Sequence, residues 1–255
     1  RGGERSHSLA TILARVGFKV GVLKGGYQAY RRRVRVYLEK MKSLKYIVIS
    51  GPTGSGKTNF LKAIERQGGQ MIDIEACAGH KGSILGDSLT TPQPTQKIFE
   101  GLLAAKAEEM DIKRPVFIED EGSRVGIRHL PIELWNAKKL APRCRLIVPV
   151  DFRVRCIRDD YKYFEQKEHM DALCTRLKGL HRRVGKECVD RYLELAKEGS
   201  WDELVALLLE THYDKAYAKS AERAKPKNAK NGEGETVYKV SLKSEKDYDP
   251  EASMV

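Results

Sequence analysis

Residues 45–58, KYIVISGPTGSGKT, constrain the fold more than any other part of this sequence. The first six are mostly apolar or β-branched, as in a buried strand, and the last eight fit the pattern GxxxxGK[ST]. A strand, a glycine-rich turn and a helix in this order present backbone N–H groups to phosphate oxygens. The sequence therefore predicts an α/β domain built around a P-loop.

Two side chains of this loop carry chemistry of their own. Lys57 brings a positive charge to bound phosphates, and the hydroxyl of Thr58 is a ligand of the kind that Mg²⁺ takes. We predict a catalytic role for Lys57 and a metal-binding role for Thr58. The predicted phosphate-binding residues are Gly51, Thr53, Gly54, Ser55, Gly56, Lys57 and Thr58.

Apolar strands and amphipathic helices alternate after the loop. Further strands are predicted at residues 70–76, 115–120 and 145–150, and helices at 59–68, 96–110 and 131–139. This alternation is typical of a parallel sheet with helices on both faces, as in P-loop NTPases. The pattern from 154 to 224 is helical, with an apolar stripe over 201–209.

Composition divides the chain into three parts. Residues 1–42 are strongly basic, residues 43–223 carry the strand and helix pattern, and residues 224–255 read as a polar linker and tail. Within the tail, residues 238–243 alternate between apolar and polar, which is enough for one edge strand.

The strand predicted at 115–120 ends in two carboxylates, Glu119 and Asp120, and Glu121 follows. In a parallel sheet these side chains reach the edge where a phosphate-bound metal lies. We predict that Glu119 and Asp120 act in catalysis and that Asp120 binds metal together with Thr58. A solvated acidic turn is the alternative.

The connection at residues 77–96, CAGHKGSILGDSLTTPQPTQ, is long enough to predict a functional loop. We predict that His80, Lys81 and Ser83 on this loop contact a substrate anion. We also predict that Arg153 and Arg155, just past the strand predicted at 145–150, close over phosphates. An exposed loop histidine and an ordinary helix start are the alternatives.

The chain begins with a glycine-rich turn, RGGERS, that runs into a helical pattern. This predicts an anion-binding loop at a helix N-terminus, made of Arg1, Gly2, Gly3, Arg5 and Ser6. A short buried strand is predicted at 18–23. Because no strand precedes the turn, we expect the first half of this unit to lie upstream or in another polypeptide.

A second helix in this region carries arginines around an apolar stripe. Residues 1–42 hold eleven Lys and Arg against two Glu, in a chain of net charge +12. Such a basic segment suits a polyanionic partner, and RNA is the natural candidate. The predicted RNA-binding residues are Arg31, Arg32, Arg33 and Arg35. A solubilising face is the alternative.

Cysteine spacing and hydropathy indicate the cellular compartment of the protein. The five cysteines include no CxxC pair, which favours reduced core thiols over a disulfide framework or a metal site. No apolar run approaches the ~20 residues that span a bilayer, and no secretory segment is apparent. We expect a cytoplasmic protein that does not enter membranes.

Several segments, in order over about residues 1–220, together resemble the tRNA 2-selenouridine synthase family. The loop at 51–58 is common to many families, whereas the segments at 24–32 and 73–83 are far more specific. The matching segments are RGGERS at 1–6, KGGYQAYRR at 24–32, GPTGSGKT at 51–58, DIEACAGHKGS at 73–83, QPTQ at 93–96 with Phe99 and Glu100, EDEGSRVG at 119–126 and DFRVR at 151–155.

The resemblance implies a domain organisation. In that family a rhodanese domain precedes the P-loop domain, and its catalytic cysteine sits just before the RGG-x-RS turn. Residues 1–42 would then be the C-terminal part of a rhodanese-like α/β domain without its cysteine. The nucleophile would come from upstream residues or from a second polypeptide, as in a split archaeal form of the enzyme.

The resemblance also implies a reaction. The family replaces the sulfur of a wobble 2-thiouridine in tRNA by selenium, through an S-geranyl intermediate made from geranyl diphosphate and then displaced with selenophosphate. The P-loop, with Mg²⁺, would hold the diphosphate, and the basic helix would contact tRNA phosphates. The sequence departs from the family at Lys81, usually arginine, at Thr95, usually serine, and at Leu85, usually aromatic.

Two other functions fit the residues alone. A small-molecule kinase or NTPase would bind ATP or GTP at the same loop and would not need tRNA, although the basic N-terminal region argues against it. A non-catalytic RNA-binding subunit would use the loop for binding only.

Overall fold

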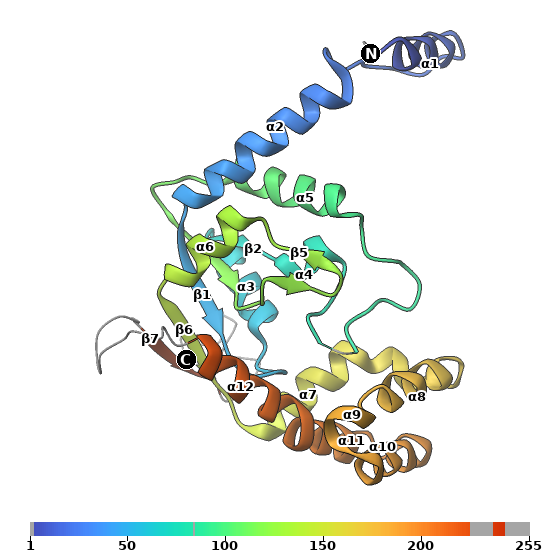
Figure 1. Cartoon of the computed structure of the whole chain (residues 1–255), viewed down its shortest axis with the longest axis vertical. Coiled ribbons are helices and arrows are strands. Elements are labelled where there is room, and N and C mark those ends of the chain that lie inside the picture. Colours follow the sequence, from blue (N-terminus) through green and yellow to red (C-terminus); the bar gives the residue numbers. More distant parts are fainter. Residues whose placement is uncertain (1–2, 84, 225–236, 243–255) are drawn as a thin grey trace.

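The computed structural model describes residues 3–83, 85–224 and 237–242. Arg1, Gly2, the predicted linker at 225–236 and the tail from 243 lie outside the described residues. The central feature is a five-stranded parallel sheet of order β2-β3-β1-β6-β7 (Figure 1). Its strands are β1 (Lys45–Ser50), β2 (Gln70–Ile72), β3 (Pro115–Glu119), β6 (Arg143–Ile147) and β7 (Val237–Ser241).

Helices cover both faces of this sheet, which confirms the predicted P-loop NTPase-like architecture. On one face Val48 packs in a cluster with side chains of α2 (Gly26–Lys40), α5 (Gln96–Glu109) and α6 (Ile132–Leu140). On the other, Ile49 packs with Leu61 of α3 (Lys57–Arg66) and Phe152 of α7 (Val150–Tyr161). Adjacent residues of β1 therefore point to opposite buried faces, as in an internal parallel strand.

The predicted helical region forms a layer beyond one end of the sheet (Figure 1). It has its own apolar core, to which Leu204, Val205, Leu208 and Leu209 of the predicted stripe contribute. After α7 it contains 3-10 turns at Lys162–Glu165 and Lys167–His169, α8 (Met170–Lys178), α9 (His181–Val184), α10 (Lys186–Glu198), α11 (Trp201–Leu208), a π-helical turn at Leu209–Tyr213 and α12 (Asp214–Ala224).

The predicted strand at 18–23 is wrong. These residues form an exposed segment without regular secondary structure after α1 (Glu4–Arg15), with Phe18 64% exposed, and α1 itself buries none of its apolar stripe. A strand needs a neighbour for its backbone hydrogen bonds, and none of the described strands pairs with this segment. By contrast, α2 packs on α5, and Lys40 donates to the carbonyls of Ala107 (2.8 Å) and Met110 (2.7 Å) at the end of α5.

Of the strand predicted at 70–76, only the first three residues form a strand, and the rest of the prediction is wrong. The strand ends at Ile72 because the Asp73 carboxylate accepts a hydrogen bond from Ala76 N (2.7 Å) and starts helix α4 (Ile74–Ala78). The short pair β4 (Arg124–Val125) and β5 (Arg128–His129) and the 3-10 turn Met41–Ser43 complete the described elements. None of the described helices is both long and apolar enough to cross a bilayer.

Candidate functional site

The P-loop lies between β1 and α3 in a conformation that only glycine adopts easily. Gly54 and Gly56 have φ of 78° and 74°, in the left-handed region. A Cβ on Gly54 would lie 2.7 Å from the carbonyl oxygen of Arg153, so the loop packs closely on α7. Lys57 donates from Nζ to the carbonyl of Gly51 (3.2 Å) across the loop. The predicted phosphate-binding residues are thus brought together in one cradle.

Glu119 is the carboxylate nearest to the loop hydroxyl. Thr58 Oγ1 donates to Glu119 Oε1 (2.9 Å), while Oε2 accepts from the backbone N–H groups of Ile74 (3.1 Å) and Glu75 (3.2 Å). Burial, with Asp73 and Glu121 nearby, raises the pKa of Glu119 to about 7. Thr58 and Glu119 form an oxygen pair suited to Mg²⁺, which commonly combines one or two carboxylates with substrate phosphates. In the described residues no cluster of three or more His, Cys, Asp or Glu could hold a metal by itself.

The carboxylate of Asp120 has different partners from that of Glu119. The Asp120 carboxylate pairs with Arg143 (2.6 Å) and lies 3.9 Å from Lys138 Nζ. The buried Lys138 also donates to the carbonyl of Glu119 (2.9 Å) and to that of Glu121. Two cations therefore fix the end of β3, and the predicted metal-binding role of Asp120 stays a prediction.

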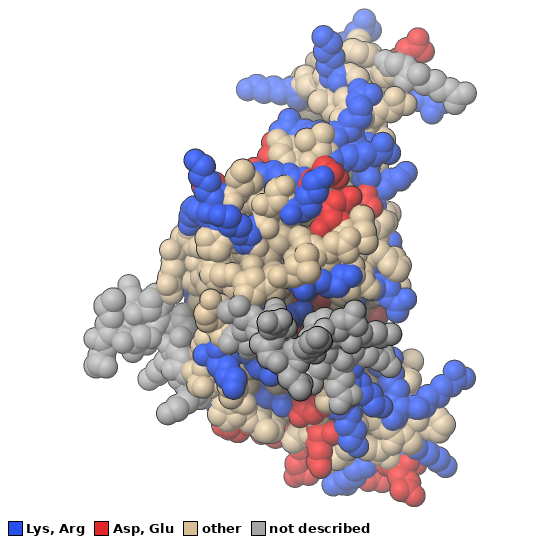
Figure 2. All heavy atoms as spheres, turned by 60° about the vertical axis from the view of Figure 1, so that its left-hand side comes forward, with Lys and Arg blue, Asp and Glu red and all other residues tan. Residues whose placement is uncertain are grey.

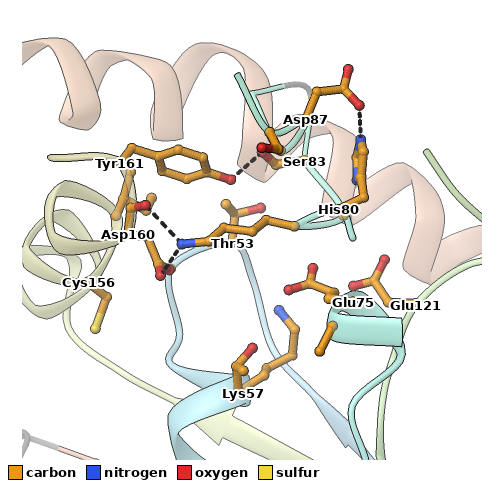
Figure 3. A pocket seen from close by; sticks show the side chains of 18 of the residues that line it. Thr53, Lys57, Glu75, His80, Ser83, Asp87, Glu121, Cys156, Asp160 and Tyr161 are labelled. Atoms are coloured by element: carbon orange, nitrogen blue, oxygen red, sulfur yellow. Dashed lines mark hydrogen bonds and ion pairs between the residues drawn. The ribbon is translucent and has the colours of Figure 1, made fainter. Parts of the chain in front are cut away.

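Glu75 is a residue of the site that the sequence interpretation missed. It lines the cleft with Glu121, and Figure 3 shows its carboxylate facing the ammonium group of Lys57. Burial and the charge of Glu121 raise the pKa of Glu75 to about 9, whereas Lys57 opposes this shift. The feature of the sequence that indicates this position is Asp73, a residue type that often starts a helix. Because α4 starts there, its second residue, Glu75, lies at the cleft beside the P-loop.

The loop after α4 forms one wall of a cleft of ≈1190 Å³ that opens at the P-loop. Lys81 donates to the carboxylate (2.6 Å) and the carbonyl (2.8 Å) of Asp160, and the Ser83 hydroxyl lies 2.8 Å from that of Tyr161 (Figure 3). His80 Nε2 lies 3.3 Å from Asp87 Oδ1. The predicted loop residues therefore all lie at the cleft, although Lys81 is already paired with α7.

Helix α8 holds the tip of this loop. Arg176 donates to the carbonyls of Leu85 (2.7 Å) and Asp87 (2.9 Å), and the Leu85 side chain is buried in the core of the helical layer. The loop thus ties the α/β part to the helical layer on the side of the cleft opposite the P-loop.

Arg153 supports the P-loop from behind. Its Nε donates to the carbonyl of Thr53 (2.9 Å), and its other two nitrogens bind the Asp214 carboxylate (2.5 and 3.1 Å). The side chain is buried and is not among the residues that line the cleft. The predicted contact of Arg153 with substrate stays a prediction. Its observed contacts, with Thr53 and Asp214, hold the P-loop to α7 and α12.

We expect Arg153→Ala to lower the free energy of unfolding by about 2 kcal/mol, since it leaves Thr53 and Asp214 without their buried partner. For a domain of this size the melting temperature should fall by roughly 4–8 °C. Pyrophosphate affinity, measured by calorimetry, should fall as well. Arg155→Ala is the matched control, because Arg155 is exposed on the same helix and forms its ion pair with Asp151, one turn earlier. An equal loss of stability in both variants would contradict the role of Arg153.

The arginines of α2 fall into two pairs. Arg31 binds Glu100 on α5 (2.5 Å) and Arg33 binds Glu108, so these charges are partly neutralised within the molecule. Arg32 and Arg35 are exposed. Figure 2 shows Lys and Arg gathered over the end of the molecule formed by α1 and the start of α2. Of the predicted anion loop, Gly3 caps α1 with φ 83°, and Arg5 and Ser6 lie in its first turn.

A parallel sheet with this loop after its central strand, and a cleft beside it, defines a P-loop α/β protein. Residues 44–247 match the family model described as the tRNA 2-selenouridine synthase AAA domain, and the chain belongs to this family.

Two curated relatives agree with this assignment. A protein named tRNA 2-selenouridine synthase from Sulfurovum sp. (strain NBC37-1) is 34% identical over 250 residues, covering 88% of this chain and 67% of that protein. One of the same name from Cronobacter sakazakii (strain ATCC BAA-894) is 32% identical over 216 residues, covering 77% and 55%. The chain thus spans between about half and two thirds of the length of these relatives.

Proposed function

We propose that this chain is the P-loop part of a transferase that replaces the sulfur of a wobble 2-thiouridine in tRNA by selenium through an S-geranyl intermediate. Membership of the family and the names of both relatives support the overall reaction. The geranyl donor is supported by one observation above all: a phosphate cradle opens into a cleft with an apolar and aromatic wall. This wall includes Leu89, Ile157, Tyr161, Tyr213 and Tyr217.

The phosphate cradle and the apolar wall of the cleft each suit one half of geranyl diphosphate. The diphosphate lies on the loop amides, and Lys57 stabilises the negative charge that develops on it as the C1–O bond breaks. The apolar tail lies against the aromatic wall, which buries part of its surface. Mg²⁺, held by Thr58 and Glu119, would add charge stabilisation to the leaving group when it is bound.

The proposed tRNA surface is the exposed side of α2. We expect the double change Arg32→Gln and Arg35→Gln to reduce the slope of log K against log salt for tRNA binding by ~1.4–1.8, which corresponds to two lost phosphate contacts. The matched control changes Arg31 and Arg33 to Gln, which breaks ion pairs with α5 and should leave the slope nearly unchanged. If the salt dependence changes only in the control variant, tRNA does not bind through Arg32 and Arg35.

Residues 3–23 present an apolar surface that suits a protein partner. Leu9, Ile12, Val16, Phe18 and Leu23 are each more than half exposed in the structure. We propose that this surface packs on the first half of a rhodanese-like domain, which supplies the catalytic cysteine in the same or a second polypeptide. The selenophosphate step would use the anion loop at the start of α1, and the whole reaction is expected in the cytoplasm.

The experiment that tests this function is prenyl transfer to 2-thiouridine tRNA by the purified chain, followed by mass spectrometry of the nucleosides. S-geranyl-2-thiouridine should form with geranyl diphosphate, and pyrophosphate should inhibit. Transfer of a γ-phosphate from ATP or GTP to a small molecule, with no geranyl transfer, would favour the kinase instead. Binding of tRNA and donor without any transfer would favour a non-catalytic subunit.

A further inference from the structure

His80 is a buried imidazole beside the cleft, and one of its two ring nitrogens is unpartnered among the described residues. Its side chain is 8% exposed, it lines the same cleft as the P-loop, and its Nε2 lies 3.3 Å from Asp87 Oδ1. Its Nδ1 is buried and has no hydrogen-bond partner in the part of the chain that the structure describes. A buried ring nitrogen without a partner is costly, so a group that binds there is expected to come from the ligand.

The surrounding structure holds this ring in place. The backbone of His80 forms a bridge with Asp87, and its N–H donates to the carbonyl of Glu75 (3.1 Å). Gly126, at φ 57°, lies against the ring, since a Cβ there would come within 2.6 Å of His80 Cδ2. The imidazole is thus fixed by a carboxylate at one nitrogen and by close packing along one edge, as in an oriented general base.

We propose that His80 accepts a proton from the nucleobase during prenyl transfer, with Asp87 as the positioning residue that orients the imidazole. This proposal rests on the function proposed above and names a residue that carries part of its chemistry. The ligand group at Nδ1 is the ring N3–H of a 2-thiouracil.

The step balances without any further reactant. The sulfur of the 2-thiouracil forms a bond to C1 of the prenyl donor, and the C1–O bond breaks with its electron pair leaving on the diphosphate. The S-alkylated ring has no hydrogen on N3, so that proton must leave, and Nδ1 of His80 takes it. The resulting imidazolium is stabilised by Asp87 at its other nitrogen.

The charges around the ring favour this role. Burial lowers the pKa of His80, so the imidazole is neutral and able to accept a proton near pH 7. Arg176 on α8 lowers it further, whereas Asp87 on the loop and Glu121 after β3 raise the pKa and so stabilise the imidazolium once it forms.

The test compares wild type with His80→Gln, which keeps a polar side chain of similar size but cannot take up the proton. We expect prenyl transfer at pH 7 to fall about a hundredfold or more, because a general base contributes 10²–10⁴. The deficit should shrink as pH rises and the thiouracil ionises by itself. The dissociation constant of geranyl diphosphate should stay within a few fold of wild type. His129→Gln, at an exposed histidine of β5, is the control and should change nothing.

Asp87→Asn provides a readout that a merely structural role would not give. Because Asp87 raises the pKa of His80, its loss should shift the acid limb of the pH–rate profile to lower pH and slow transfer at the plateau. His80→Gln with the wild-type rate and profile, or with a loss that matches its loss of donor affinity at every pH, would overturn the proposal. Failure of the proposed function looks different, because wild type itself would then transfer no prenyl group at any pH.

Discussion

Lys57→Ala is expected to lower prenyl transfer by at least about a hundredfold while the protein stays folded. The ammonium group reaches across the P-loop to the Gly51 carbonyl and faces the cleft, where the diphosphate of the proposed donor would gather charge as it leaves. Loss of one preorganised donor of this kind costs on the order of 3 kcal/mol in the transition state. Among the described residues the Lys57 side chain belongs to no apolar cluster, so the melting temperature should change little. Single-turnover transfer of labelled geranyl groups measures the first effect and calorimetry the second.

Lys62→Ala is the matched control for this variant. Lys62 lies on the same helix, is exposed and also lines the cleft, but it is more than one turn away from the phosphate cradle. Its loss removes the same net charge, so a general electrostatic effect on tRNA binding would appear in both variants. If Lys57→Ala transfers geranyl groups as fast as wild type, the P-loop does not hold the prenyl donor.

The parts of the fold that could be predicted are those encoded locally. The strand at Lys45–Ser50 has the predicted bounds, and α5 begins at Gln96 as expected, because apolar periodicity and the cap residue Thr95 act within a few residues. The P-loop motif fixes the position of a strand, a turn and a helix together. From these elements the parallel sheet follows, since alternating strands and helices allow few other arrangements.

The contacts that could not be predicted join residues far apart in the chain. Arg153 looks like a phosphate ligand in the sequence, but its guanidinium is occupied by Thr53 and Asp214, the latter 61 residues away. The sequence of α2 does not reveal its partners on α5, so from sequence alone Arg31 and Arg33 look as available as Arg32 and Arg35. The segment at 18–23 has the composition of a strand, but strand formation depends on a neighbour that local sequence does not reveal.

The direction of the carboxylates at the end of β3 could not be predicted from the sequence either. Three acidic residues in a row give no indication of which one faces the P-loop, because side-chain direction depends on where the strand ends. The structure directs Glu119 to Thr58 and Asp120 to Arg143. It also brings in Glu75, whose place depends on the helix that Asp73 caps.

A polypeptide consisting of residues 1–255 is expected to transfer geranyl groups but to fail at selenium exchange. In the proposed function the anion loop at the start of α1 binds a thiolate nucleophile, whereas the five cysteines lie on α4, β6, α7, α8 and α10, and none lies on α1. Burial raises the pKa of Cys77 to about 11 and also raises that of Cys144, so neither is a thiolate at neutral pH. In Figure 1, α1 lies at the opposite end of the molecule from α8 and α10.

The assay follows selenium incorporation into 2-thiouridine tRNA supplied with geranyl diphosphate and selenophosphate. Adding a polypeptide with the first half of a rhodanese domain and a reactive cysteine should restore exchange, whereas its cysteine-to-serine variant should not. Geranyl transfer should be the same in all three mixtures, because it depends on the cleft alone, and it shows that the chain is active in each. Full exchange by residues 1–255 alone would mean that one of the five thiols reaches the reacting carbon, and serine substitution of each in turn would identify it. That outcome would remove the reason for assigning the RGGERS turn to a rhodanese-like active site, since the turn would then hold no nucleophile.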